Sequence, residues 1–168
     1  MPRNKAKQLK AKVITVKWID ISKGDNVNEN YRSRLLAREI KTSNRPDLFA
    51  ATPPLEALRL LISEAATDNG SGSKVLMIND GSRAFFEAAA RRKVAVMLPA
   101  EALEEGEDAK NTVGILLQSL YGTRDAALAL DLFGKEVMEG VGYITGKSTP
   151  CVYQHGKEPS VGWRHGDD

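Results

Sequence analysis

The sequence feature that most constrains the fold is a short apolar run that ends close to a carboxylate. The run is Val75–Ile78, and Asp80 follows after one asparagine. An unbroken apolar run of this length is typical of a strand that is buried on both faces. A carboxylate at the end of such a strand loses hydration and needs a partner, and a metal ion is one such partner. Ser82 then predicts the cap of a following helix that contains Phe85.

Asp80 has two interpretations. The first is a turn or capping residue, because aspartate is common at such positions. The second comes from the far end of the chain, where Asp167 and Asp168 follow a strand-like segment at a Gly-Asp turn signal. Carboxylates after two strands can converge on the same cations, and phosphoryl transfer by two metals about 3.5–4 Å apart requires such a cluster.

A basic β-hairpin is predicted near the start of the chain. Residues 12–22 alternate in polarity, and residues 31–41 form a second candidate strand after a polar turn. The two-residue period of a strand places Arg32, Arg34 and Arg38 on one face. This face either meets phosphates or is a solvated edge that discourages aggregation, and the residues alone favour neither interpretation.

The rest of the chain mixes helices and hairpins, which favours an α+β fold over alternating βαβ units. Residues 1–11 are basic and poor in apolar residues, so we expect them to be disordered. The other expected elements, all from apolar periodicity and turn signals, are a helix from 53 to about 67 that packs on the sheet, strands over 93–98 and 112–120, a helix opened by residues 122–123, and an antiparallel pair over 149–155 and 160–165.

Composition excludes several classes of protein. The single cysteine, Cys151, allows no internal disulfide, and with two histidines the chain offers little for a zinc site. The basic leader lacks the apolar core of a signal peptide, and no run approaches the length of a membrane span. We therefore expect an intracellular protein without a membrane partner, in the cytoplasm or the nucleus.

Six blocks of the chain, in order, resemble the reverse transcriptase domain of copia-type LTR retrotransposon polyproteins. The third block resembles the first catalytic motif, Asp-Val-x-x-Ala-Phe, and the last stands where that family has Tyr-Val-Asp-Asp. The blocks are Tyr31–Arg38, 47–61, Asp80–Phe86, Leu120–Asp125, Pro150–Tyr153 and His165–Asp168. Together they span roughly residues 12 to 168.

The resemblance implies an RNA-directed DNA polymerase, which is a nucleotidyltransferase. Its fold is of the polymerase right-hand type, with fingers that contain the hairpin and a palm built on an antiparallel sheet. The fingers would cover residues 12–72 and the palm residues 73–168. We expect an incomplete domain, truncated at the catalytic turn, without the thumb and without the RNase H and integrase parts of a polyprotein.

The same resemblance assigns the catalytic and metal-binding residues. Asp80 would bind two Mg²⁺ ions, which Mn²⁺ can replace, Asp167 would bind at least one, and Asp168 would lie beside them. The expected partners are an RNA or DNA template-primer and deoxynucleoside triphosphates. We expect Asp80 and Asp167 on adjacent strands of one antiparallel sheet, with their carboxylates on the order of 4–7 Å apart.

Five further residues are implied as substrate contacts. Phe85 would exclude a 2′-hydroxyl beside the sugar; its alternative interpretation is a core phenylalanine. Gly122 and Arg124 fall in the block near the template and the incoming base. Arg32 and Arg34 are the candidates for phosphate contact, the usual role of arginine at such sites.

Several departures from the family pattern widen the choice of function. Gly81 replaces a valine, Leu130 a tryptophan, and His165-Gly166 a Tyr-Val pair. Three hypotheses follow: a degenerate polymerase fragment with little activity alone, a non-catalytic nucleic-acid-binding remnant, and an inert structural remnant.

Overall fold

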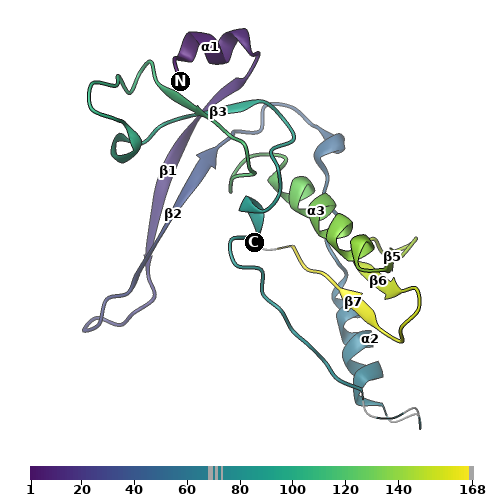
Figure 1. The fold of residues 1–168 in the computed structure, drawn as a ribbon. Coiled ribbons are helices and arrows are strands. Elements are labelled where there is room, and N and C mark those ends of the chain that lie inside the picture. Colours follow the sequence, from purple (N-terminus) through teal and green to yellow (C-terminus); the bar gives the residue numbers. More distant parts are fainter. Residues whose placement is uncertain (68–69, 71, 73, 167–168) are drawn as a thin grey trace.

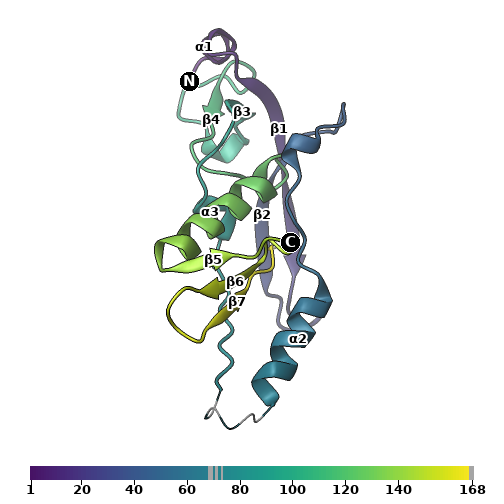
Figure 2. The same ribbon diagram turned by 90° about the vertical axis from the view of Figure 1, so that its right-hand side faces the viewer.

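Two small sheets organise the fold, and a long helix lies between them (Figures 1 and 2). The computed structural model describes residues 1–67, 70, 72 and 74–166. The helices are α1 (Arg3–Gln8), α2 (Leu55–Ala66) and α3 (Ala126–Gly140), with 3₁₀ turns η1 (Pro46–Leu48), η2 (Ala84–Phe86) and η3 (Ala100–Ala102). The strands are β1 (Lys12–Ser22), β2 (Tyr31–Arg38), β3 (Val94–Met97), β4 (Val113–Ile115), β5 (Tyr143–Thr145), β6 (Val152–His155) and β7 (Val161–Trp163). The α+β class is confirmed.

The first sheet has the order β2-β1-β3-β4. The outer part of β1, Thr15–Ser22, pairs antiparallel with β2, so the predicted hairpin is confirmed. The inner part of β1 pairs parallel with β3, which in turn pairs antiparallel with β4. Apolar residues of β1, β2 and β3 form its core with Leu120. The sheet takes strands from both sides of the expected boundary at residue 72, and the outer hairpin projects away from the rest of the molecule (Figure 1).

The basic leader forms α1 where disorder was expected. Ala6 is fully buried and packs in one cluster with Ala95 and Val113. Backbone hydrogen bonds fasten the segment to β4 and the chain before it: the Met1 ammonium donates to the Val113 carbonyl at 2.9 Å, and the Arg3 amide donates to Asn111 at 2.7 Å. The helix is stable here because of these distant contacts, which its own composition does not reveal.

The second sheet has the order β5-β6-β7 and is antiparallel throughout. The predicted pair near the end of the chain is confirmed as β6 and β7, and β5 adds a strand that was not expected. An ion pair fixes this sheet to α3, between Arg164 and Asp131. The Arg164 side chain crosses α3 at Gly134, where a Cβ atom would lie 2.8 Å from the arginine Cδ.

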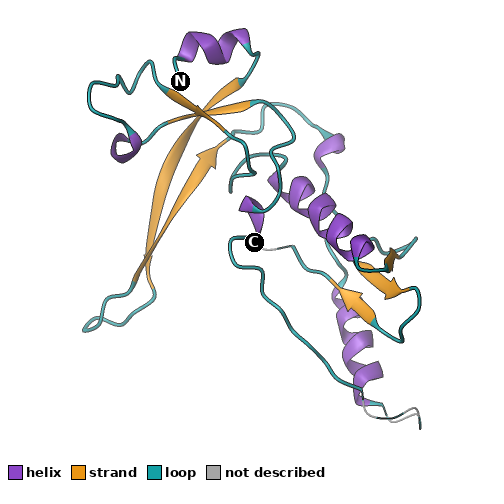
Figure 3. Ribbon diagram, viewed as in Figure 1, coloured by secondary structure: helices purple, strands orange, loops and turns teal. Residues whose placement is uncertain are grey.

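The prediction of a buried strand over residues 75–78 is wrong. These residues are extended but belong to neither sheet, and they run toward η2 as a loop (Figure 3). Val75 is 88% exposed and Ile78 is 86% exposed, because no strand among the described residues pairs with them. Ser82 caps no helix: η2 is one 3₁₀ turn that begins after Arg83, which has a φ of 54°.

Other boundaries differ by a few residues. Helix α2 spans Leu55–Ala66 but buries no residue, so the expected packing on a sheet is loose. The apolar segment over 112–120 is a strand only at β4. Helix α3 starts later than expected, because Gly122 has a φ of +84° and turns the chain first. Within the described part of the chain, no helix is long and apolar enough to cross a membrane.

Candidate nucleic-acid interface

One face of the β1–β2 hairpin carries cations and no carboxylate. Directly opposite pairs share a face, and the register opposes Arg32 to Ile21, Arg34 to Ile19 and Arg38 to Thr15. The same register adds Lys17, which lies opposite Leu36. We call Lys17, Arg32, Arg34 and Arg38 the basic face. The only acidic residue of the two strands, Asp20, lies on the other face opposite Ser33.

The basic face meets an aromatic cluster at Arg34. The Arg34 guanidinium carbon lies 5.7 Å from the centre of the Tyr121 ring, within the range of a cation–π contact. The ring centres of Phe85 and Phe86 lie 4.5 Å and 5.9 Å from that of Tyr121. We call Arg34, Phe85, Phe86 and Tyr121 the Tyr121 cluster. Phe85 is 7% exposed and Phe86 is 40% exposed, so Phe86 is the more accessible of the two phenylalanines.

Backbone contacts hold the Tyr121 cluster against β2. The Ala37 amide donates to the Tyr121 carbonyl at 2.7 Å. A Cβ atom on Gly122 would lie 2.1 Å from the Ala37 carbonyl oxygen, closer than real atoms approach. Glycine at 122 therefore permits both the turn and the contact with the strand.

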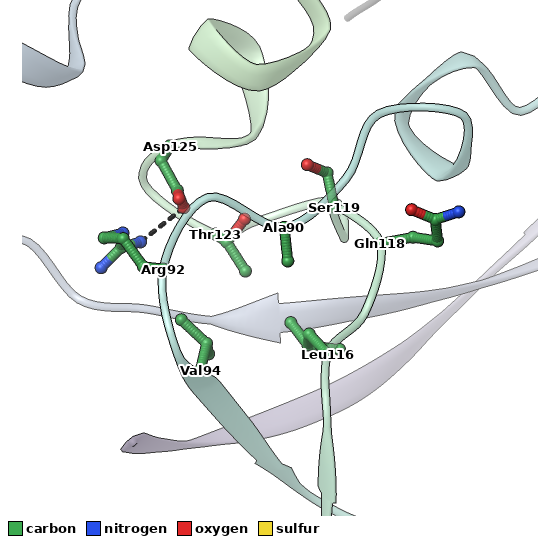
Figure 4. A pocket seen from close by; sticks show the side chains of 8 residues that line it. All are labelled: Ala90, Arg92, Val94, Leu116, Gln118, Ser119, Thr123 and Asp125. Carbon is green, nitrogen blue, oxygen red and sulfur yellow. Dashed lines mark hydrogen bonds and ion pairs between the residues drawn. The ribbon is translucent and has the colours of Figure 1, made fainter. Parts of the chain in front are cut away.

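A buried carboxylate connects the hairpin to α3. The Glu39 side chain, directly after β2, is fully buried. It accepts hydrogen bonds from Arg92 at 3.0 and 2.8 Å, from Lys12 Nζ at 2.9 Å and from the Arg124 amide at 2.8 Å. Arg92 also donates to Asp125 at 2.5 Å (Figure 4). We call these five residues the Glu39 cluster.

Hydrogen bonds and opposite charges within the Glu39 cluster shift the pKa values of Glu39 and Arg92. Hydrogen bonds from Arg92 are the main cause that lowers the pKa of Glu39 from 4.5 to about 2, against a smaller opposing effect of burial. The Glu39 and Asp125 carboxylates raise the pKa of Arg92. The adjacent cavity, lined by Val94 and Leu116 among others, has a volume of about 10 Å³ (Figure 4). That is room for about one water molecule, so this cavity is too small for an organic ligand.

The expected catalytic carboxylates are not assembled by the described residues. Asp80 is exposed and lies on the unpaired extended segment, not at the end of a buried strand. Asp167 and Asp168 fall outside the described residues. Over residues 1–67, 70, 72 and 74–166, no group of three or more His, Cys, Asp or Glu side chains could hold a metal ion. Asp80 alone does not make the oxygen shell that Mg²⁺ needs, so we derive no chemistry through a metal here.

Three of the five expected substrate contacts lie in or next to the Tyr121 cluster, and the other two lie elsewhere. Arg34 and Phe85 belong to the Tyr121 cluster, and Gly122 is next to it in the chain. Arg124 belongs to the Glu39 cluster. Arg32 lies further out on the basic face, and Asp80 precedes η2. The packing of Phe85 with Ala126 and Leu130 agrees with its alternative interpretation as a core residue.

Sequence reasoning missed three important residues. Tyr121 belongs to the Leu120–Asp125 block, so that block contained the signal. Lys17 shares a face with the arginines of β2, and this follows from the register of the hairpin. Nothing in the local sequence marks Glu39, because its partners lie 27 to 85 residues away.

Comparison of the chain with protein families, curated proteins and solved structures found no match. The chemistry of the interface therefore has to be inferred from its own residues and geometry.

Proposed function

We propose that this protein binds nucleic acid along the basic face and the Tyr121 cluster. The observation that carries the proposal is the position of Arg34, which sits both on a face free of carboxylates and over an aromatic ring. Cations recognise phosphates, and aromatic rings stack on bases. The two kinds of group adjoin here at Arg34 and Tyr121.

The composition of the surface favours single strands. Ile19, Ile21 and Leu36 lie between the cations of the basic face and provide apolar contact. Phe86 offers an exposed ring that a splayed base can reach. Among the residues described, no ion pair joins Lys17, Arg32 or Arg38 to a carboxylate, so binding phosphate breaks no internal pair.

The test is the salt dependence of binding to a fluorescent oligothymidylate. Each phosphate contact on a single strand contributes about −0.7 to the slope of log K against log salt. The double variant Arg32→Ala/Arg34→Ala should lower the magnitude of the slope by roughly 1.4. Lys7→Ala, on α1, removes an exposed cation away from the hairpin and should leave the slope nearly unchanged. An unchanged slope in the double variant would make the hairpin a solvated edge.

A second candidate is a reverse transcriptase fingers–palm fragment of the copia type. One observation besides the resemblance favours it. Adjacent residues of α3 contact the segment that follows Asp80 and the segment that precedes Asp167. Phe85, five residues after Asp80, packs on Leu130, while Arg164, three residues before Asp167, pairs with Asp131. The segments next to the expected catalytic residues thus meet the same turn of α3, while Asp167 and Asp168 themselves lie outside the described residues.

The second candidate is tested by primer extension on an RNA template with Mg²⁺ or Mn²⁺. We expect little extension, because Asp80 lies on a segment that no strand holds in place, and misplacing a reacting group costs about a hundredfold in rate. Robust extension that Asp80→Asn abolishes would establish the polymerase. Equal extension by both proteins would indicate a contaminant.

A further inference from the structure

We propose that the loop after β2 contains a separate pocket for one nucleotide unit, with the base on Phe49 and the phosphate on Lys41, Arg45 and Arg124. The pocket has a volume of about 340 Å³ and is also lined by Pro46 and Leu48. Pockets of roughly 300–1,000 Å³ accommodate small organic ligands. The pocket adds a binding site to the proposed nucleic-acid interface. The proposal rests on that function where the ligand is a longer strand, and it does not where the ligand is a free mononucleotide.

In each arginine of the pocket, hydrogen bonds within the protein hold one edge of the guanidinium, and the other edge keeps its donors for a ligand. Arg45 donates from Nε and Nη2 to Asp47, at 2.8 and 2.6 Å. Arg124 donates from Nη2 to the Ser43 carbonyl at 2.7 Å, and its amide is fixed by Glu39. Among the described residues, Nη1 of each arginine has no acceptor that satisfies hydrogen-bond geometry. Side chains fixed in this way lose little entropy when they bind an anion.

The charge of the pocket favours an anion. Lys41, Arg45 and Arg124 line it, and no carboxylate does. Asp47 neutralises Arg45 in part, since Arg45 is the main cause that lowers the pKa of Asp47. The excess of positive charge nevertheless remains with Lys41 and Arg124. A dianionic phosphate or the phosphodiester of a strand matches this excess.

Phe49 supplies the second half of the specificity. Its side chain lines the pocket and is 72% exposed. An exposed aromatic ring gains free energy when it is buried, and a base that stacks on it provides that burial. A ligand that combines a flat ring with a phosphate uses both features of the pocket, whereas an acidic peptide uses only its charge.

The experiment measures binding of adenosine monophosphate by titration calorimetry and of oligothymidylate by fluorescence anisotropy, on the whole chain. Phe49→Ala should weaken both ligands about tenfold, the factor that corresponds to 1.4 kcal/mol of lost stacking. Phe49→Trp should restore binding, and Lys7→Ala should change neither. Phe49 is exposed, so its replacement leaves the fold intact, which circular dichroism checks.

The outcomes separate the pocket from the interface. If the oligonucleotide binds and the hairpin double variant weakens it, yet Phe49→Ala weakens neither ligand, the pocket proposal is overturned and the interface stands. If the oligonucleotide does not bind but the mononucleotide binds in a Phe49-dependent manner, the pocket stands for free nucleotides and the interface falls. Equal displacement of either ligand by polyglutamate would show recognition of charge alone and would overturn the pocket proposal.

Discussion

Two segments of this molecule have nearly the same local sequence and opposite environments. Lys93 is followed by the four apolar residues of β3, and Lys74 is followed by the four apolar residues 75–78. Strand β3 lies between β1 and β4, and Ala95 is fully buried. The segment 75–78 has no strand on either side, and each of its residues is at least 52% exposed. An apolar run therefore specifies what a segment can bury, while the rest of the chain decides whether it is buried.

The largest effect should come from placing a charge in each segment. Val96→Asp puts a carboxylate into the core between Ile14 and Leu120, which costs several kcal/mol and should unfold the protein. Val75→Asp should change the free energy of unfolding by less than about 0.5 kcal/mol. Thermal denaturation followed by circular dichroism measures both. Similar losses in the two variants would mean that residues 75–78 are buried in solution.

The ion pairs just before the two segments should also differ in their contribution to stability, with the larger contribution before β3. Arg92 precedes β3 and binds the fully buried Glu39, whereas Lys74 precedes the exposed segment and binds Glu64, whose side chain is 61% exposed. Arg92→Met should cost roughly 3 kcal/mol, because it leaves a buried carboxylate without its main partner. Lys74→Met should cost less than about 1 kcal/mol. Urea denaturation compares them, and equal costs would contradict the structural role of Glu39.

Acid should destabilise the protein by protonating Glu39, the carboxylate that Arg92 binds just before β3. The pKa of Glu39 is about 2 in the folded protein against an ordinary value of 4.5. A lowered pKa contributes stability that is complete above pH 4.5 and is lost as the pH falls toward 2; the total is roughly 3 kcal/mol. Unfolding free energies measured across this range should show the loss in the wild type and a smaller one in Glu39→Gln. Parallel pH profiles would place the acid sensitivity elsewhere.

The substitutions with the smallest expected effect on stability should instead change self-association. The double variant Met77→Ser/Ile78→Ser removes apolar surface that is 77% and 86% exposed. Its unfolding free energy should stay within about 0.5 kcal/mol of the wild type. Light scattering should show less association, because exposed extended apolar segments pair between molecules. Unchanged scattering would mean that this segment is not the one that associates.

The sequence predicted those parts of the fold that depend on local signals. The alternation in β1 predicts the first strand of the hairpin, the two-residue period of β2 predicts its basic face, and turn residues predict the pair β6–β7. Local signals fail where distant residues decide the outcome: they predict a strand over residues 75–78, and they predict disorder for α1, where Ala6 packs against Ala95 and Val113. For the candidate interface, the resemblance selected the block with Gly122 and Arg124, but the role of Glu39 depends on contacts that no periodicity encodes.

The Glu39 cluster also bears on the order in which the chain folds during synthesis. Of the partners of Glu39, Lys12 precedes it by 27 residues, while Arg92 and Arg124 follow it by 53 and 85. On the ribosome, the hairpin therefore emerges when Lys12 is the one described hydrogen-bond partner of Glu39 that has already been made. That carboxylate lacks its arginine partners until Arg92 and Arg124 have been made, and contacts over such separations form slowly. The hairpin should thus dock late, after β3 and the start of α3 have left the exit tunnel.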